Sequence, residues 1–142
     1  QGGRILDFGC GAGAIGISIA VLHPEVYLTM VDVNRLGTDC ASDNVLRNAL
    51  SSRVGVYNRD GYEGLEDQKF DWILSNPPFH EGNAVMHPLI ERAPEHLEAR
   101  GKMALVVMRV EPYMKAIERV FRSFRILAIH ERYNVILAED PT

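Results

Sequence analysis

Short apolar runs and helical patterns alternate along this chain. The apolar runs, each predicted to form a strand, are residues 4–8, 26–33, 54–57, 70–74 and 102–108. The helical patterns are residues 13–22, 35–49, 84–98 and 111–122. Because strands separated by helices form right-handed βαβ units, the alternation predicts an α/β fold in which helices sandwich a mostly parallel sheet. A tightly joined last pair, 125–129 and 133–137, is expected to be antiparallel and brings the sheet to seven strands.

Proline and glycine set the expected ends of two helices. Pro24 cannot continue a helix, so the first helix is expected to stop shortly before it. Gly101 follows the third helical pattern, and glycine suits the left-handed conformation just past a helix end.

The composition fits a single globular domain, covering residues 1–142. Of the 142 residues, 46% are apolar and 24% are charged, which is typical of a chain that buries a core. The apolar runs fall far short of the roughly 20 residues that span a bilayer, and no basic-then-apolar leader opens the chain. We therefore expect a soluble, cytoplasmic protein. Since Gln1–Gly3 lead directly into a strand, the domain is expected to be the catalytic part of a longer protein.

The two cysteines indicate neither a disulfide framework nor a metal site. Cys10 lies in a glycine run and Cys40 in a predicted helix. Their spacing matches no CxxC or zinc-ligand pattern, so free thiols and no bound metal are expected.

Basic residues gather in the last third of the chain. Residues 100–132 hold eight Lys or Arg against three Glu, although the whole chain carries a net charge of −4. The overall charge argues against a general nucleic-acid binder. The basic segment is either a surface that faces phosphates or an ordinary solvated helix face.

A glycine-rich stretch follows the first predicted strand, where ligands bind in parallel sheets. Gly9, Gly11 and Gly13 permit a tight turn and let a ligand approach the backbone at the start of a helix. With Ala14 and Asp32, the stretch also fits a dinucleotide fingerprint, and a turn without any ligand is a further alternative.

Three acids end three successive predicted strands. Asp7 would repel a pyrophosphate but could help hold a cationic ammonium or sulfonium, which favours S-adenosylmethionine over NAD. Asp32 can accept hydrogen bonds from both ribose hydroxyls. Asp60 could accept from the adenine amino group, or it could simply form an Asp-Gly turn. The three acids together are a stronger signal than any one alone.

Two prolines stop the strand at 70–74. Neither Pro77 nor Pro78 has an N–H for a sheet ladder, so a rigid loop is expected to hold Asn76 and Phe79 at the end of the sheet. A turn that places Phe79 in the core is the structural alternative.

These motifs together resemble a known enzyme family. Asp7–Gly13, Asp32 and Asn76–Phe79 are similar to class I S-adenosylmethionine-dependent methyltransferases that modify exocyclic amino groups. His80–Gly82 and the spacing to the C-terminus resemble the small-domain subgroup that includes ribosomal RNA guanine-N2 methyltransferases. The resemblance covers nearly the whole chain and implies a Rossmann-like three-layer sandwich. It also implies ribosomal RNA as substrate, with docking aided by an N-terminal domain that this sequence does not contain.

The resemblance gives the proline loop a chemical role. A base amine is a poor nucleophile because its lone pair is delocalised into the ring. The side-chain oxygen of Asn76 and the backbone carbonyl of Pro77 can each accept one N–H, which favours a tetrahedral nitrogen. Phe79 would stack on the extruded base. His80 could contact the base, or it could be a loop histidine without a catalytic duty.

Several functions stay open on this basis. The same residues could methylate adenine N6 in nucleic acid or a protein glutamine amide instead of guanine N2. A non-catalytic domain that binds RNA or a partner is the rival from another class. An NAD-binding domain is the third possibility, although it has no use for the Asn76 loop.

Overall fold

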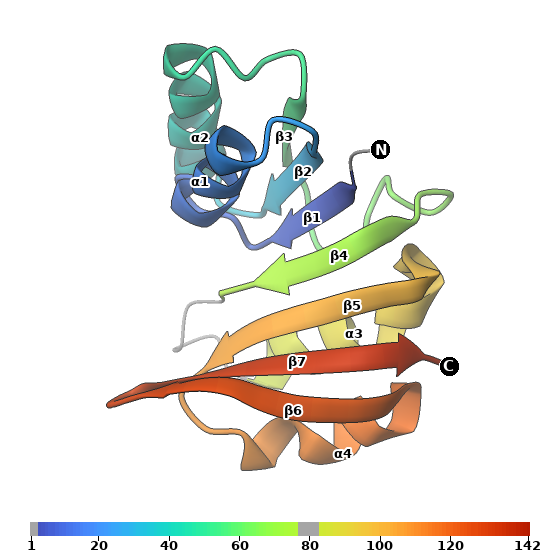
Figure 1. The fold of residues 1–142 in the computed structure, drawn as a ribbon. Coiled ribbons are helices and arrows are strands. Elements are labelled where there is room, and N and C mark those ends of the chain that lie inside the picture. Colours follow the sequence, from blue (N-terminus) through green and yellow to red (C-terminus); the bar gives the residue numbers. More distant parts are fainter. Residues whose placement is uncertain (1–2, 77–82) are drawn as a thin grey trace.

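Seven strands form one sheet in the computed structural model, which describes residues 3–76 and 83–142 (Figure 1). The strands are β1 (Arg4–Phe8), β2 (Tyr27–Asp32), β3 (Val54–Asn58), β4 (Phe70–Ser75), β5 (Leu97–Val107), β6 (Phe121–His130) and β7 (Tyr133–Pro141). The helices are α1 (Ala14–Leu22), α2 (Arg35–Arg47), α3 (Asn83–Arg92), the short 3-10 helix η2 (Ala93–His96) and α4 (Glu111–Val120).

The strand order is β3-β2-β1-β4-β5-β7-β6. The first five strands in this order are mutually parallel, and β7 runs antiparallel to both of its neighbours, β5 and β6. The order reverses direction between β1 and β4, so this is the switch point where α/β sheets bind ligands. The predicted Rossmann-like fold with an antiparallel strand near its C-terminus is confirmed.

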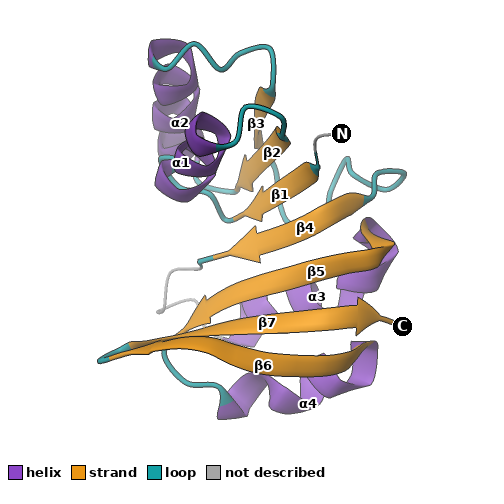
Figure 2. Cartoon of the chain, in the orientation of Figure 1, coloured by secondary structure: helices purple, strands orange, loops and turns teal. Residues whose placement is uncertain are grey.

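Helices cover both faces of the sheet and form three layers (Figure 2). Helices α1 and α2 pack on the β1-β2-β3 half around one set of buried side chains, which includes Ile17, Met30 and Val45. Helices α3 and α4 pack on the opposite face around a second set, which includes Leu89 and Ile117. Since β1 contributes Ile5 to one set and Leu6 and Phe8 to the other, it is buried on both faces, as expected for a central parallel strand.

The third predicted helix is shorter than the sequence indicated. Helix α3 ends at Arg92, η2 ends at His96, and Leu97 already belongs to β5. Pro94 has no N–H to continue the helical ladder, and Leu97 is buried and paired with Phe70. The prediction that Gly101 ends a helix in the left-handed region is therefore wrong.

Gly101 instead lies buried inside β5. The register between β4 and β5 shifts next to it, between Phe70 and Trp72. A Cβ at Gly101 would lie 2.9 Å from the carbonyl oxygen of Glu98. The glycine thus allows a β-bulge. From the sequence alone, a glycine in a bulge looks the same as a glycine that ends a helix.

None of the helices among the described residues is long and apolar enough to span a bilayer.

Candidate active site

The glycine loop joins β1 to α1 at the switch point of the sheet. Gly9, Gly11 and Gly13 have φ angles of 75°, 54° and 88°, which are left-handed values that favour glycine. The backbone N–H groups of Gly9 and Cys10 both donate to the carbonyl oxygen of Val31, at 2.9 Å each. These bonds hold the loop against the end of β2.

The glycines of this region serve two different purposes. Among the described residues, a Cβ on Gly9 or Gly11 would meet nothing within 4 Å, so the surface above them is open to a ligand. A Cβ on Gly13 would lie 3.0 to 3.3 Å from side chains of α1, β2 and α2. Gly13 therefore also lets the two helices approach the sheet closely.

Asp32 closes the second strand and organises the loop above it. One carboxylate oxygen accepts the backbone N–H of Gly11 at 2.7 Å, and the other accepts the N–H of Asn34 at 2.8 Å. Each oxygen keeps a second acceptor position, so the half-buried carboxylate can still accept from ligand hydroxyls.

Asn34 adds a cap to the helix that follows Asp32. Its side-chain oxygen accepts the N–H groups of Leu36 and Gly37 at 3.0 and 3.3 Å, which begins α2. A Cβ on Gly37 would lie 3.3 Å from the backbone of Gly11. The first turn of α2 thus packs directly against the glycine loop.

Asp7 is a buried acid beneath the same loop. Burial raises its pKa from 3.8 to about 6; the backbone N–H of Gly16 opposes this rise, and the negative charge of Asp32 adds to it. One oxygen, Oδ2, is buried without a hydrogen-bond partner among the described residues. A Cβ on Gly16 would lie 2.9 Å from that oxygen. A buried acceptor without a partner, below an open loop, fits a nearby cationic ligand reached directly or through water.

Asn76 follows β4 directly beside the glycine loop. The register pairs Phe8 with Ser75, and the Ser75 hydroxyl donates to the carbonyl oxygen of Phe8 at 2.9 Å. The next residues on the two strands are Gly9 and Asn76, so parallel pairing places them at the same edge. Asn76 is exposed there.

Asp60 lies in a turn after β3. Its carbonyl accepts the N–H of Glu63 at 3.1 Å, and Gly61 has a φ of 58°, so the Asp-Gly turn that was the alternative interpretation of Asp60 is present. The carboxylate belongs to an exposed residue. The preceding residue, Arg59, donates its N–H to the carbonyl of Asp32 at 3.0 Å, which keeps the turn next to the second strand end.

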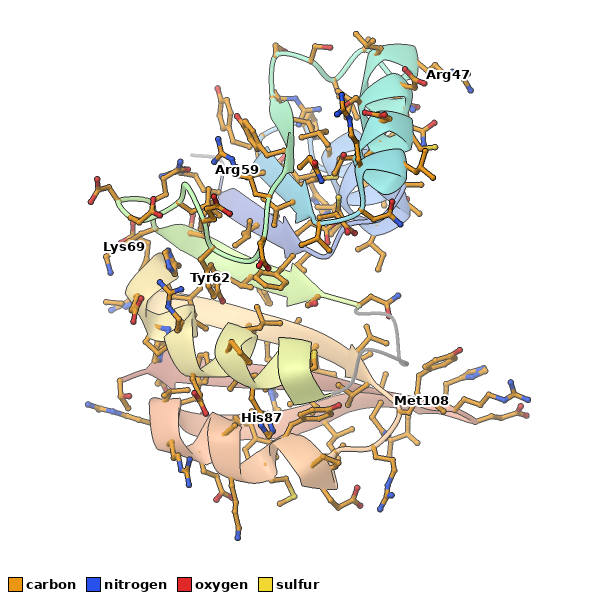
Figure 3. All side chains as sticks on the ribbon, turned by 180° about the vertical axis from the view of Figure 1, so that it is seen from behind. Arg47, Arg59, Tyr62, Lys69, His87 and Met108 are labelled. Carbon is orange, nitrogen blue, oxygen red and sulfur yellow. The ribbon has the colours of Figure 1, made fainter. Side chains whose placement is uncertain are left out.

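An aromatic stack anchors this turn to the other half of the fold. The ring of Tyr62 stacks on that of buried His96 at 4.2 Å and lies 5.2 Å from Phe8. Its hydroxyl donates to the carbonyl of Leu89 in α3 at 2.7 Å. Burial holds the pKa of Tyr62 well above its usual value, so the hydroxyl keeps its proton and remains a donor. Figure 3 shows Tyr62 between the turn and α3.

The remaining predicted site residues are Pro77, Phe79 and His80, and they lie outside the described residues. Their roles stay predictions from the sequence. Of the two cysteines, Cys40 is exposed and Cys10 is half-buried, and both are free. Burial raises the pKa of Cys10 to about 12, so its thiol stays neutral at physiological pH. In the described part of the chain, no three His, Cys, Asp or Glu side chains gather where they could hold a metal ion.

Several residues that shape the site were not predicted from the sequence. Asn34 precedes a helical pattern and could have been recognised as an N-cap. Ser75, Gly16 and Gly37 act through long-range packing, which no local pattern reveals. Asn44 donates to the carbonyl of Ala12 at 3.1 Å across the loop, and an Asn in mid-helix gives no sign of such a contact.

A family model described as "Methyltransferase small domain" matches residues 1–137. The chain belongs to this methyltransferase small-domain family. Its membership confirms the family, the enzyme class and the cofactor, S-adenosylmethionine, that the sequence motifs predicted, and it excludes the NAD-binding alternative.

Two curated bacterial proteins are similar in sequence to this small-domain methyltransferase. It is 36% identical to "Ribosomal RNA small subunit methyltransferase C" of Photorhabdus laumondii, over 96% of this chain and 40% of that protein. It is 32% identical to the uncharacterized protein YbxB of Bacillus subtilis, over 96% of this chain and 70% of the relative. The chain therefore spans about two fifths of the length of the ribosomal RNA methyltransferases it matches.

Solved structures confirm the small-domain methyltransferase fold. A T. thermophilus 16S ribosomal RNA guanine-N2 methyltransferase, solved with AdoMet and guanosine, matches with a TM-score of 0.87 and 28% identity. The match covers 99% of this chain and 38% of that one. A ribosomal protein L11 methylase of Lactobacillus delbrueckii has a TM-score of 0.80 at 18% identity, which supports the fold alone.

Proposed function

We propose that this domain methylates an exocyclic amino nitrogen, guanine N2 of ribosomal RNA, with Asn76 as the residue that activates the amine. The observation that carries the proposal is the position of Asn76 beside Gly9, fixed by the Phe8–Ser75 pairing and the 2.9 Å bond between these residues. The side-chain amide of Asn76, which can accept a hydrogen bond, therefore lies next to the glycine loop that is proposed to bind the cofactor. The guanosine bound to the T. thermophilus relative supports guanine over other acceptors.

The residues of this site fit S-adenosylmethionine, which supplies an electrophilic methyl group on a sulfonium. Gly9 and Gly11 leave open space among the described residues. Asp32 retains acceptor positions for ribose hydroxyls, and the unpartnered oxygen of Asp7 favours a positive charge nearby. Asp60, on the turn beside Asp32, is proposed to accept from the adenine amino group.

The chain's own contribution to the reaction is orientation. The side-chain oxygen of Asn76 accepts one N–H of the guanine amine, and the carbonyl of Pro77 is proposed to accept the other. Both bonds favour a nitrogen whose lone pair points towards the methyl group. A nitrogen–carbon bond forms, the carbon–sulfur bond breaks, and the nitrogen then loses a proton to water. No strong base is needed because alkylation makes that proton acidic.

The experiment that tests this function compares acceptors. The domain is incubated with S-adenosylmethionine labelled in the methyl group and with one of three acceptors: unmodified small-subunit ribosomal RNA, an adenine-rich DNA duplex, or a glutamine peptide. Label in the RNA supports the proposal. Label confined to the DNA or the peptide contradicts the guanine assignment and favours adenine N6 or glutamine.

A melting-temperature measurement beside the labelling separates an enzyme from a non-catalytic domain. A ligand that binds only the folded state raises the melting temperature, by the equivalent of about 2.7 kcal/mol at a hundredfold excess over Kd. We expect this stabilisation and label transfer together. Stabilisation without label in any acceptor would indicate a domain that has kept the binding site and lost the reaction.

A further inference from the structure

Seven of the eight basic residues of segment 100–132 divide into two groups once their places in the fold are known, and the eighth, Lys115, lies within α4. Lys102 and Arg125 both pair with Glu139, at 3.2 and 3.4 Å. Arg122 is the second residue of β6, Arg119 lies in the last turn of α4 just before it, and Arg100 lies in the first half of β5. Because β5 and β6 both run antiparallel to β7, their first residues lie at the edge of the sheet opposite Asn76.

Two arginines lie at the same edge as Asn76. Arg109 follows the end of β5, and Arg132 lies in the turn between β6 and β7. Both are exposed. The side-chain amide of Asn134 in β7 donates to the carbonyl of Met108 at 3.0 Å, so the chain that carries Arg109 is tied to the hairpin. Figure 3 shows Met108 at the base of this hairpin.

The β6–β7 hairpin extends beyond the end of β4. Ser75 is level with Leu105 of β5, and Leu105 pairs with Ile136 of β7. Residues 133–135 therefore continue past Ser75, by roughly 10 Å at about 3.3 Å per residue. Between β4 and β7 lies only β5, so the lateral offset is two strand spacings, also about 10 Å. Figure 1 shows the hairpin projecting beyond β4 and β5.

Apolar side chains accompany the two arginines. Ile129 is 78% exposed, Met108 is 49% exposed and Tyr133 is 38% exposed. Exposed apolar side chains of this size next to a site indicate a binding role, and arginine and aromatic side chains contact phosphates and bases in nucleic-acid complexes. Glu131 lies beside Arg132 in the same turn, so the end of the hairpin has little net charge. It must therefore recognise its partner by local contacts and not by a strong electrostatic field.

We infer that the hairpin surface, defined as Met108, Arg109, Ile129, Arg132 and Tyr133, binds the RNA strand that flanks the methylated nucleotide. The inference rests on the proposed function and extends it to a second contact region. Arg109 and Arg132 neutralise phosphates of the strand on one side of the target, while Ile129 and Met108 contact the sugars and bases exposed when one base leaves the stack. The offsets of about 10 Å along and across the strands place the surface close enough to the end of β4 to contact nucleotides next to the target.

The test measures RNA affinity against salt concentration and does not depend on catalysis. The probe is an unmodified transcript of small-subunit ribosomal RNA, and the variants are R109Q, R132Q and the control R122Q. Each lost phosphate contact lowers the slope of log K against log salt by about 0.7 to 0.9. We expect this reduction for R109Q and R132Q and none for R122Q, whose side chain lies at the opposite edge.

Two further measurements keep the inference separate from the proposed function. Affinity for S-adenosylmethionine should be the same in all three variants and the parent, which shows that the fold is intact. Methylation of free guanosine, which has no phosphate, should also be unchanged, while methylation of RNA falls at least fivefold in the double variant R109Q/R132Q. If guanosine and RNA both go unmethylated by the parent, the proposed function fails, and the salt slopes still decide whether the hairpin binds RNA.

Other results would overturn the inference. Equal salt slopes for R109Q, R132Q and R122Q would show that these arginines contact no phosphate. A dimer in sedimentation equilibrium that I129D dissociates, with RNA affinity unchanged in that variant, would assign the hairpin to a protein contact instead.

Discussion

The side-chain carboxylate of Asp32 accepts the backbone N–H of Gly11 over 2.7 Å. This bond joins the end of β2 to the glycine loop that follows β1, two segments 21 residues apart. The same carboxylate accepts the N–H of Asn34 at 2.8 Å. One side chain thus sets the loop conformation and also presents acceptors to the proposed ribose position.

Asp32→Ala is expected to weaken S-adenosylmethionine binding by about 1.5–3 kcal/mol, because ribose hydroxyls lose a charged acceptor and the loop loses its anchor. Isothermal titration calorimetry measures the affinity. Asp32→Asn is the matched control, since it keeps one oxygen, and its loss should be smaller. Unchanged affinity in the Ala variant would remove Asp32 from the site.

Asp7→Asn is expected to stabilise the ligand-free protein at pH 7. The folded pKa of Asp7 is raised from 3.8 to about 6, so the folded state holds a proton that the unfolded state releases between these values. The free energy of unfolding therefore falls as pH rises from about 4 to about 6, by roughly 3 kcal/mol at most. Urea titrations of both proteins should give a difference that grows over this window and disappears below pH 4.

The raised pKa of Asp7 also leads us to expect that cofactor affinity depends on pH. Only the ionised carboxylate attracts a cation, so affinity for S-adenosylmethionine should fall as the pH drops through about 6. Asp7→Asn should bind more weakly at pH 7.5 and show no loss in this window. A parent protein with equal affinities at pH 5 and pH 7.5 would contradict the role of Asp7.

Asn76→Ala is expected to leave cofactor affinity nearly intact and to lower the single-turnover rate of methyl transfer by about a hundredfold or more. Because Asn76 is exposed at the end of β4 and Ser75, which holds the strand end, is unchanged, the substitution should leave the fold intact. If binding and rate fall together, Asn76 serves the cofactor or the fold and not the amine.

Tyr62→Phe is expected to destabilise the fold by about 1–2 kcal/mol, because the buried carbonyl of Leu89 loses its 2.7 Å donor. Tyr27→Phe is the control, since Tyr27 is 58% exposed and should change stability by less than about 0.5 kcal/mol. Thermal unfolding of the three proteins measures the difference. Equal melting temperatures would show that the hydroxyl bond does not anchor the turn to α3.

The chain of 142 residues is expected to bind S-adenosylmethionine but to methylate RNA less efficiently than a full-length relative. Its net charge is −4, and only two arginines of the basic segment lie near Asn76, so few phosphate contacts are available. The ribosomal RNA methyltransferases it matches are more than twice as long. Methyl incorporation at low salt compares the two. Equal kcat/KM values would show that no docking region is needed.

The parts of the fold that follow from local pattern were predictable. Alternating apolar and helical segments predicted every strand and the antiparallel final pair. The strand-end pattern also predicted that Gly9, Gly11, Asp7 and Asp32 lie at one edge of the sheet, and their binding roles stay predictions. The end of α3 was not predictable, because Leu97 joins β5 through its pairing with Phe70, a contact that the sequence does not display. The stack of Tyr62 on His96 was missed for the same reason, since the two residues meet only when the turn packs on η2.

The positions of the basic residues in the sheet decide which of them lie near the proposed site. From the sequence alone, residues 100–132 formed one positive segment that could be either a phosphate-facing surface or a solvated helix face. In the structure, Lys102 and Arg125 form ion pairs with Glu139. Arg109 and Arg132 lie at the same edge of the sheet as Asn76. The direction of each strand decides which basic side chains can contact a substrate, and composition alone does not reveal strand direction.

Identification of the methylated nucleoside tests the central claim most directly. The domain is incubated with S-adenosylmethionine labelled in the methyl group and with unmodified small-subunit ribosomal RNA, and the RNA is digested to nucleosides for mass spectrometry. We predict labelled N2-methylguanosine, formed by the parent protein and lost in Asn76→Ala. Labelled N6-methyladenosine, or N2-methylguanosine formed equally well by Asn76→Ala, would contradict the account.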